Sequence, residues 1–137
     1  MTLALHLKTC GALLIMLAVL HPAFAKRLRW KEELAGVPLL TRQIFWVHCL
    51  FIGIILLQFG VLSLAFSHAL LERTLLAKVV LGGLVIFWSA RLFAQHFIYS
   101  PQIWRGHRFN TVMHVVFTGL WTYLVAVYGA ALWFQYK

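Results

Sequence analysis

Acidic residues are nearly absent from this chain. Its 137 residues include no Asp and only three acidic residues in all, against 12 Lys and Arg, which gives a formal net charge of +9. Without Asp, a Ser-His-Asp catalytic triad cannot be built. The acids also lie outside the long apolar runs, where a proton-coupled transporter would usually carry a carboxylate. Glycine-rich phosphate loops and the glycine-flanked serine of hydrolases are missing too, which argues against nucleotide binding and hydrolysis.

Cysteine is also scarce. Cys10 and Cys49 fall on different apolar segments without metal-ligand spacing, so we expect neither a disulfide framework nor a zinc ribbon. Apolar residues, by contrast, make up 63% of the chain, and charged residues only 11%. A soluble domain of this size could not bury so much apolar surface. The chain is therefore predicted to lie in a lipid bilayer, and its basic charge is interpreted as a topology signal rather than as a nucleic-acid site.

Four apolar runs approach the length that a membrane span requires. A bilayer core of about 30 Å needs roughly 20 apolar residues in a helix, and the runs cover about 3–24, 44–67, 79–99 and 111–134. They are too long, and alternate too little, to be strands of a transmembrane barrel. The sequence predicts an all-α integral membrane protein, in which residues 1–137 form a single domain of four transmembrane helices.

The first apolar run has two interpretations. A weakly basic start, an apolar stretch and Ala23-Phe24-Ala25 resemble a signal peptide with its cleavage site. We expect instead a retained helix, ended by Pro22 and the basic residues that follow it.

Positive charge is concentrated in two of the predicted loops. These loops contain Lys26, Arg27, Arg29, Lys31, Arg42, Arg105 and Arg108. The positive-inside rule then places loops 25–43 and 100–110 in the cytoplasm and both termini outside, in what we expect to be a bacterial inner membrane. The longer loop mixes charged residues with Trp30 and apolar residues, which suits a short amphipathic segment on the membrane surface.

Two segments share four residue types at the same spacing. Arg42, His48, Phe51 and Gly53 recur as Arg108, His114, Phe117 and Gly119. Coincidence is one explanation in a chain so rich in Phe. Arg and His are uncommon inside membranes, however, so the match also suggests a duplicated helical hairpin with both copies in the same orientation. A duplication would place the two histidines at matching depth.

Five of the seven histidines are predicted near the cytoplasmic side, namely His21, His48, His96, His107 and His114. His48 and His114 lie about four to six residues inside their helices, roughly 6–9 Å below the interface. His6 and His68 lie toward the other side and are interpreted as interfacial residues. A single imidazole there can simply bind a carbonyl or a polar neighbour. Histidines from four helices at one level indicate a shared site, because ionisable groups at such depth usually face a bundle interior.

Arg91 is the second indication of a site. It lies inside the third apolar run, five residues before His96, where a guanidinium keeps its charge and needs partners. We expect it to face His96 and to bind an anionic group: a haem propionate, a lipid phosphate, or the carboxylate of Glu32 or Glu33. The alternative is a side chain that extends to the interface. Gln95, one turn later, shares the helix face of Arg91.

Imidazoles that face one another at equal depth, with an arginine nearby, are what a bis-histidine haem requires. The sequence therefore favours a haem b that is ligated by His48 and His114, with His96 and His21 as substitute ligands and Arg91 beside a propionate. Membrane electron transfer would be the function. In helix count and histidine placement the chain is similar to small membrane-anchor cytochromes of the b type, although it contains no diagnostic motif of such proteins.

Other occupants and another class of function stay open at this point. The same histidines suit a chlorophyll-type pigment, a quinone or a mononuclear metal site, and no cofactor at all is also compatible with the sequence. A di-iron oxygenase is not expected, because acidic ligands and closely spaced histidines are missing. The main alternative is a non-catalytic accessory subunit that packs against other membrane subunits or a second copy of the chain. The sequence does not decide whether the protein is an enzyme.

Overall fold

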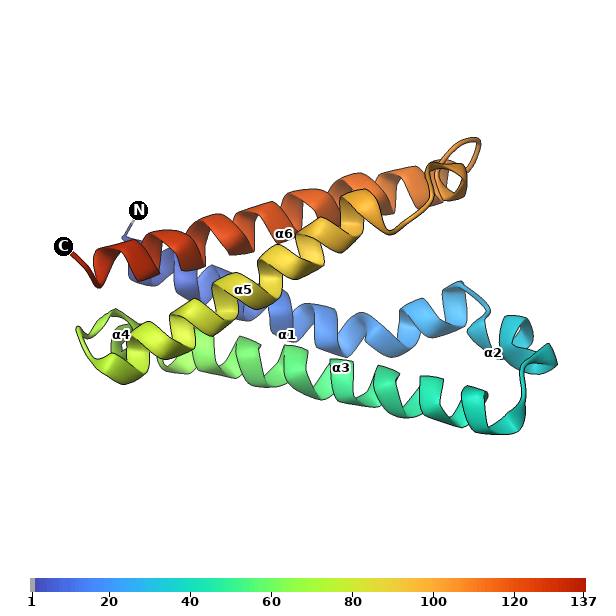
Figure 1. Cartoon of the computed structure of the whole chain (residues 1–137), viewed down its shortest axis with the longest axis horizontal. Helices are drawn as coiled ribbons and strands as arrows, with labels where there is room; N and C mark the ends of the chain where they lie inside the picture. The colour runs from blue at the N-terminus through green and yellow to red at the C-terminus, as the bar shows by residue number, and fades with distance from the viewer. Residues whose placement is uncertain (1) are drawn as a thin grey trace. The chain divides into compact units, whose positions relative to one another are not determined.

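The computed structural model describes residues 2–137, and the regular elements in this range are all helices. The long helices are α1 (Leu3–Arg27), α3 (Leu39–Ala65), α5 (Leu75–Phe97) and α6 (Arg108–Phe134) (Figure 1). The short elements between them are α2 (Trp30–Glu33), η1 (Leu34–Gly36), α4 (Ser67–Leu71) and η2 (Pro101–Ile103). All four long helices have the length and apolar composition to cross a membrane. The predicted all-α class with four transmembrane helices is confirmed.

Helices α3 and α5 begin earlier than their apolar runs. α3 starts at Leu39 rather than near residue 44, directly after Pro38, whose ring fixes a backbone angle compatible with a helix start. α5 starts at Leu75 rather than near residue 79, because the Thr74 hydroxyl caps it by accepting the Ala77 N–H at 3.1 Å. Hydropathy marks the part of a helix that lipid can cover, whereas capping residues set where the helix begins.

The prediction that Pro22 ends the first helix is wrong. α1 passes through Pro22 and continues to Arg27. A proline in a helix removes one backbone hydrogen bond and crowds the preceding turn, and the flanking Leu and Ala residues are good helix formers. Lys26 and Arg27 occupy the last turn, where positive charge is favourable beside the carbonyl end of a helix.

The chain divides into two compact units, which are described separately. One unit spans Lys8–Ser67 and contains most of α1 and all of α3; we call it the α1–α3 unit. The other contains the start of the chain up to Leu7 together with His68–Lys137, and we call it the α5–α6 unit.

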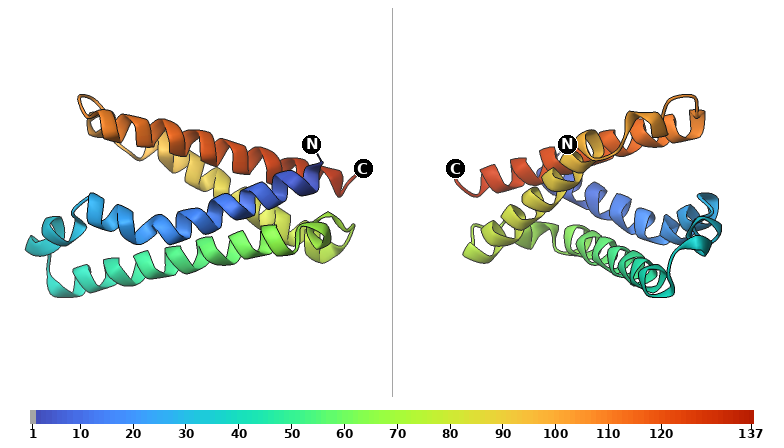
Figure 2. Two further views of the ribbon diagram at one scale, coloured as in Figure 1. Left: turned by 180° about the vertical axis from the view of Figure 1, so that it is seen from behind. Right: turned by 45° about the vertical axis from the view of Figure 1, so that its right-hand side comes forward.

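In the α1–α3 unit, the two long helices run side by side (Figures 1 and 2) and meet at Gly11 and Gly60. A Cβ atom on Gly11 would lie 2.6 Å from the Gly60 carbonyl oxygen and 2.5 Å from the Leu64 backbone nitrogen. A Cβ atom on Gly60 would lie 2.7 Å from Ile15 Cγ1. Glycine therefore permits a backbone approach that no other residue allows here, as small residues commonly do between membrane helices.

In the α5–α6 unit, the two long helices converge at the end where η2 connects them (Figures 1 and 2). Trp88 and Trp121 stack between them, with ring centroids 5.1 Å apart and an interplanar angle of 13°. Both tryptophans are buried, at 1% and 4% exposure. Near the other end of α6, Gln135 donates a hydrogen bond of 2.8 Å to the Leu70 carbonyl. Large side chains and polar contacts thus hold this unit together.

The first turn of α1 also belongs to the α5–α6 unit. His6 Nδ1 and the Tyr123 hydroxyl share a hydrogen bond of 2.9 Å, and the two rings are 6.0 Å apart. The sequence predicts His6 to be an interfacial residue, and in the structure its ring is half-buried. A contact with α6 therefore accounts for its position.

Candidate functional site

Three polar side chains form a hydrogen-bonded chain between α5 and α6. Arg91 donates from Nη1 to Gln95 Oε1 at 3.2 Å, and Gln95 Nε2 lies 2.7 Å from His114 Nδ1. The first bond joins residues one turn apart on α5, and the second crosses to α6. Gln95 is only 3% exposed. We call this arrangement the Arg91–Gln95–His114 relay.

The relay determines which nitrogen of His114 carries a proton. Because a guanidinium can only donate, the oxygen of the Gln95 amide must face Arg91. The amide nitrogen then faces His114 and donates to Nδ1, so a neutral His114 carries its proton on Nε2. His114 Nε2 makes no hydrogen bond with a described residue and is not among the buried polar atoms. The relay therefore ends in an accessible N–H donor.

Arg91 is held by neutral groups. Its guanidinium carbon lies 5.0 Å from the centre of the Trp121 ring and 5.6 Å from that of Tyr99, and such cation–π contacts stabilise a desolvated charge. Within residues 2–137, no carboxylate pairs with Arg91. The side chain is half-buried, so it is not extended into bulk water. That it binds an anion stays a prediction.

Trp104 covers one face of the His114 ring. The two rings stack with centroids 4.2 Å apart and an interplanar angle of 30°. The loop that carries Trp104 is fastened to the start of α6, because Thr111 donates to the Trp104 carbonyl at 2.8 Å and Asn110 to the Ile103 carbonyl at 3.0 Å. The first turn of α6 thus positions an aromatic ring against a residue of its second turn.

His96 lies beside His114, with ring centroids 6.4 Å apart. Its Nδ1 donates to the carbonyl of Leu92, one turn earlier on α5, at 3.0 Å. This bond places the proton on Nδ1 and leaves a lone pair on Nε2. Since His96 is exposed, its lone pair is available to a metal ion. The two imidazoles therefore differ: His96 offers an acceptor nitrogen, and His114 offers a donor.

The α1–α3 unit contains the other two predicted site histidines. His48 is exposed, and its Nδ1 donates to the Ile44 carbonyl at 2.8 Å, so it presents the same Nε2 lone pair as His96. His21 Nε2 is buried without a hydrogen-bond partner among the described residues. The edge of the His21 ring meets Trp30 at a centroid distance of 6.2 Å.

The structure brings some of the predicted site residues together. Arg91, His96 and His114 gather at one end of the α5–α6 unit. His48 and His21 belong to the α1–α3 unit, so the predicted coordination of one metal by His48 and His114 stays a prediction. Within residues 2–137 no group of three or more His, Cys, Asp or Glu side chains is close enough to form a metal site. A haem needs only one or two imidazoles from the protein, so this finding does not bear on a haem site.

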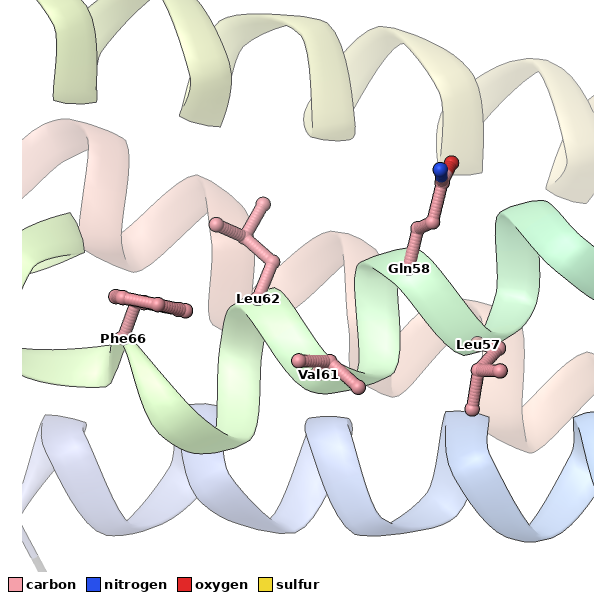
Figure 3. A pocket seen from close by; sticks show the side chains of 5 residues that line it. All are labelled: Leu57, Gln58, Val61, Leu62 and Phe66. Atoms are coloured by element: carbon pink, nitrogen blue, oxygen red, sulfur yellow. The ribbon is translucent and has the colours of Figure 1, made fainter.

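An open hollow lies along α3, separate from these histidines in the sequence. Its lining is Leu57, Gln58, Val61, Leu62 and Phe66 (Figure 3). The side chains of Gln58 and Leu62 project to the same side of the helix, as expected for residues four apart. The lining offers one amide and no imidazole or thiol, so we do not assign a cofactor to it.

Three further residues contribute to the site, namely Trp104, Asn110 and Thr111. The sequence patterns predict no role at the site for any of the three. The one available signal was position, since Asn110 and Thr111 begin the helix that carries His114, and Asn and Thr commonly bind nearby carbonyls at helix starts. Gln95, in contrast, is expected beside Arg91 from its spacing of four residues.

No protein-family model matches the chain, and neither the curated proteins nor the solved structures give a significant match.

Proposed function

We propose that this membrane protein binds a haem b, or a similar macrocycle, and takes part in membrane electron transfer. The ligands in this proposal are imidazole Nε2 atoms near the ends of α3 and α5. The observation that carries it is the state of His48 and His96. Each donates Nδ1–H to the carbonyl four residues earlier, and this hydrogen bond prepares a histidine to bind metal through Nε2.

The preferred ligands now differ from His48 and His114, the pair that the sequence favours. His114 remains a candidate, but Gln95 directs its proton to Nε2, so it would have to give up that proton or break the relay before binding iron through Nε2. His96 needs no such change, and it lies on the same unit. We therefore propose His96 and His48, each considered within its own unit, as the first candidate ligands, and His114 and His21 as substitutes.

Arg91 supports a macrocycle that bears carboxylates. It uses one of its N–H donors on Gln95, and a guanidinium has five. The remaining donors suit a haem propionate, and Arg91 lies five residues before His96 on α5. In the proposed orientation, the loops around Arg29 and Arg105 lie in the cytoplasm, since they carry the denser positive charge.

An absorption spectrum of the purified full-length protein tests the proposal. We expect a Soret band and sharp α and β bands on reduction, with a stoichiometric amount of haem per chain. His96→Ala and His48→Ala should each lower the haem content at least tenfold or convert the spectrum to that of a five-coordinate haem. His68→Ala, a change at an exposed histidine of α4, is the matched control and should leave the spectrum unchanged.

Two outcomes would contradict the proposal. Stoichiometric haem with an unchanged spectrum in both the His96 and His48 variants would reject these ligands and transfer the test to His114 and His21. A purified protein without any haem, pigment or metal would favour the alternative of a non-catalytic accessory subunit. For topology, alkaline phosphatase activity of fusions in the loops around Arg29 and Arg105 would reverse the proposed orientation.

A further inference from the structure

The Arg91–Gln95–His114 relay contains a donor that no described residue uses. Its buried amide is satisfied on both sides, by Arg91 at 3.2 Å and by His114 at 2.7 Å. If the proton of His114 moved to Nδ1, two N–H groups would face each other and the amide would lose an acceptor. Leaving a buried group unsatisfied in this way is costly. The Nε2–H of His114 is therefore oriented before any ligand arrives.

Further unmatched polar atoms lie on the same face of α6. Trp121 is 4% exposed, and its indole N–H makes no hydrogen bond with a described residue. Thr118 Oγ1 is likewise buried without a hydrogen-bond partner in residues 2–137. Positions 114, 118 and 121 recur every three or four residues, so they share one helical face. A buried donor without an acceptor is uncommon and indicates either a ligand or water at this face.

The surroundings of the donor are aromatic. Trp104 stacks on the His114 ring with centroids 4.2 Å apart, and the Tyr99 and Trp104 rings meet in a T-shaped arrangement with centroids 5.9 Å apart. Tyr99 is 41% exposed, and its neighbours Phe97 and Ile98 are 74% and 71% exposed. A hydrogen-bond donor set among exposed apolar and aromatic groups on a transmembrane helix pair suits a ligand that arrives from the lipid phase.

We propose that the Arg91–Gln95–His114 relay binds the ring carbonyl of a lipid-soluble quinone. The His114 Nε2–H donates to the carbonyl oxygen, and the quinone ring packs against Trp104 and Tyr99. Arg91 polarises the relay and favours negative charge on the bound oxygen. That such a quinone exchanges electrons with a haem rests on the function proposed above, whereas its binding does not.

A neutral carbonyl fits this site better than a phosphate does. Phosphate groups are usually bound by several direct donors from Arg or from backbone N–H groups. Here Arg91 stands at the far end of the relay, with its guanidinium carbon 5.0 Å from the Trp121 ring centre and 5.6 Å from that of Tyr99. At the His114 end the relay presents one N–H of a neutral imidazole. One directional donor beside a flat aromatic surface matches a quinone ring.

Quinone binding to the full-length protein tests the inference. The protein is placed in nanodiscs of phosphatidylcholine and labelled with a photoactivatable ubiquinone analogue, and the labelled peptides are mapped. We expect labelling of the segment around Trp104 and His114, with displacement by ubiquinone. Gln95→Leu should raise the quinone Kd at least tenfold. Gln58→Leu, which alters an exposed glutamine of α3, is the matched control and should leave the Kd unchanged.

A spectroscopic measurement keeps the inference testable if Gln95→Leu does not fold. Nitrogen NMR of the wild-type protein, with labelled histidine, identifies the protonated ring nitrogen of each imidazole. We expect Nε2–H at His114 and a shift of that signal when ubiquinone is added. A neutral His114 with its proton on Nδ1 would overturn the inference without any mutation.

The outcomes separate this inference from the proposed haem. Full haem content together with an unchanged quinone Kd in Gln95→Leu overturns the quinone site alone. Loss of quinone binding in Gln95→Leu supports the site, whether or not the wild-type protein contains haem. Displacement of the label by phosphatidylglycerol but not by ubiquinone also overturns the inference, because the ligand would then be a lipid phosphate.

Discussion

His48 and His114 occupy equivalent positions in the two segments that share the Arg, His, Phe and Gly spacing, yet their imidazoles have different partners. His48 is exposed and donates to a carbonyl of its own helix. His114 is half-buried, accepts from Gln95 of α5 and stacks on Trp104. The same spacing therefore produces a lone pair in one unit and an N–H donor in the other. What differs is the neighbouring helix, which supplies an amide only to His114.

The two units also differ in how their helices pack. The α1–α3 unit depends on glycine, which lets one backbone touch another at Gly11 and Gly60. The α5–α6 unit depends on large aromatic rings and on the relay. In a bilayer the lipid is as apolar as the side chains, so close packing and polar contacts decide helix association. A substitution at the glycine contact should therefore destabilise the α1–α3 unit and not the α5–α6 unit. A substitution in the aromatic stack or the relay should do the reverse.

The largest effect is expected at the glycine contact. Gly11→Ala adds a Cβ that would lie 2.5–2.6 Å from backbone atoms of α3, and overpacking against backbone that cannot yield should lower the free energy of unfolding by about 3 kcal/mol. Gly53→Ala and Gly119→Ala are the controls, because a methyl group added at either residue would enter open space. Each control should instead gain up to about 1 kcal/mol from helix propensity. Unfolding in mixed micelles measures all three, and equal effects would refute the backbone contact.

A smaller loss is expected from the aromatic stack in the other unit. Trp121→Leu removes the contacts with Trp88 and Arg91 and should lower the free energy of unfolding by about 1–2 kcal/mol. Trp133→Leu is the control on the same helix, since Trp133 is 65% exposed and should be nearly neutral. If both variants lose the same stability, the stack does not hold α5 against α6.

The smallest difference concerns the two histidines themselves. His114→Ala breaks the relay and should lower the free energy of unfolding by about 1 kcal/mol, as hydrogen bonds between membrane helices typically do. His48→Ala removes only a bond within its own helix and should have almost no effect on a preparation without cofactor. Mixed-micelle unfolding of the two variants compares them directly. An equal loss would mean that the shared spacing does give the two histidines equivalent environments.

The helices were predictable because hydropathy acts locally. Runs of about 20 apolar residues were sufficient to identify four spans, and the four helices are present. Pro22 shows the limit of such local rules, since α1 continues through it. The helix starts also depend on capping atoms such as the Thr74 hydroxyl, and a hydropathy window does not detect them.

The site was predictable in part. The spacing of Arg91 and Gln95 was enough to place them on one face, and His96 and His114 were both candidates. The protonated nitrogen of His114 is set by a contact with a residue 19 positions away in the sequence. That of His96 is set by a contact with a residue one turn away on the same helix. Gln95 contacts His114 because of how α6 is rotated about its axis relative to α5. The sequence pattern of a single helix does not specify this rotation. The stack of Trp104 on His114 depends likewise on the path of the loop.

The hydrogen bond between His6 and Tyr123 has a consequence for the time course of synthesis. The two residues are 117 positions apart, and at about 5–20 residues per second a ribosome needs about 6–23 s to add the intervening chain. For that interval His6 has been made while Tyr123, its partner on α6, has not. The α5–α6 unit can thus be completed only after Tyr123 has been synthesised, so His6 has no partner on α6 while the helices between them are being inserted.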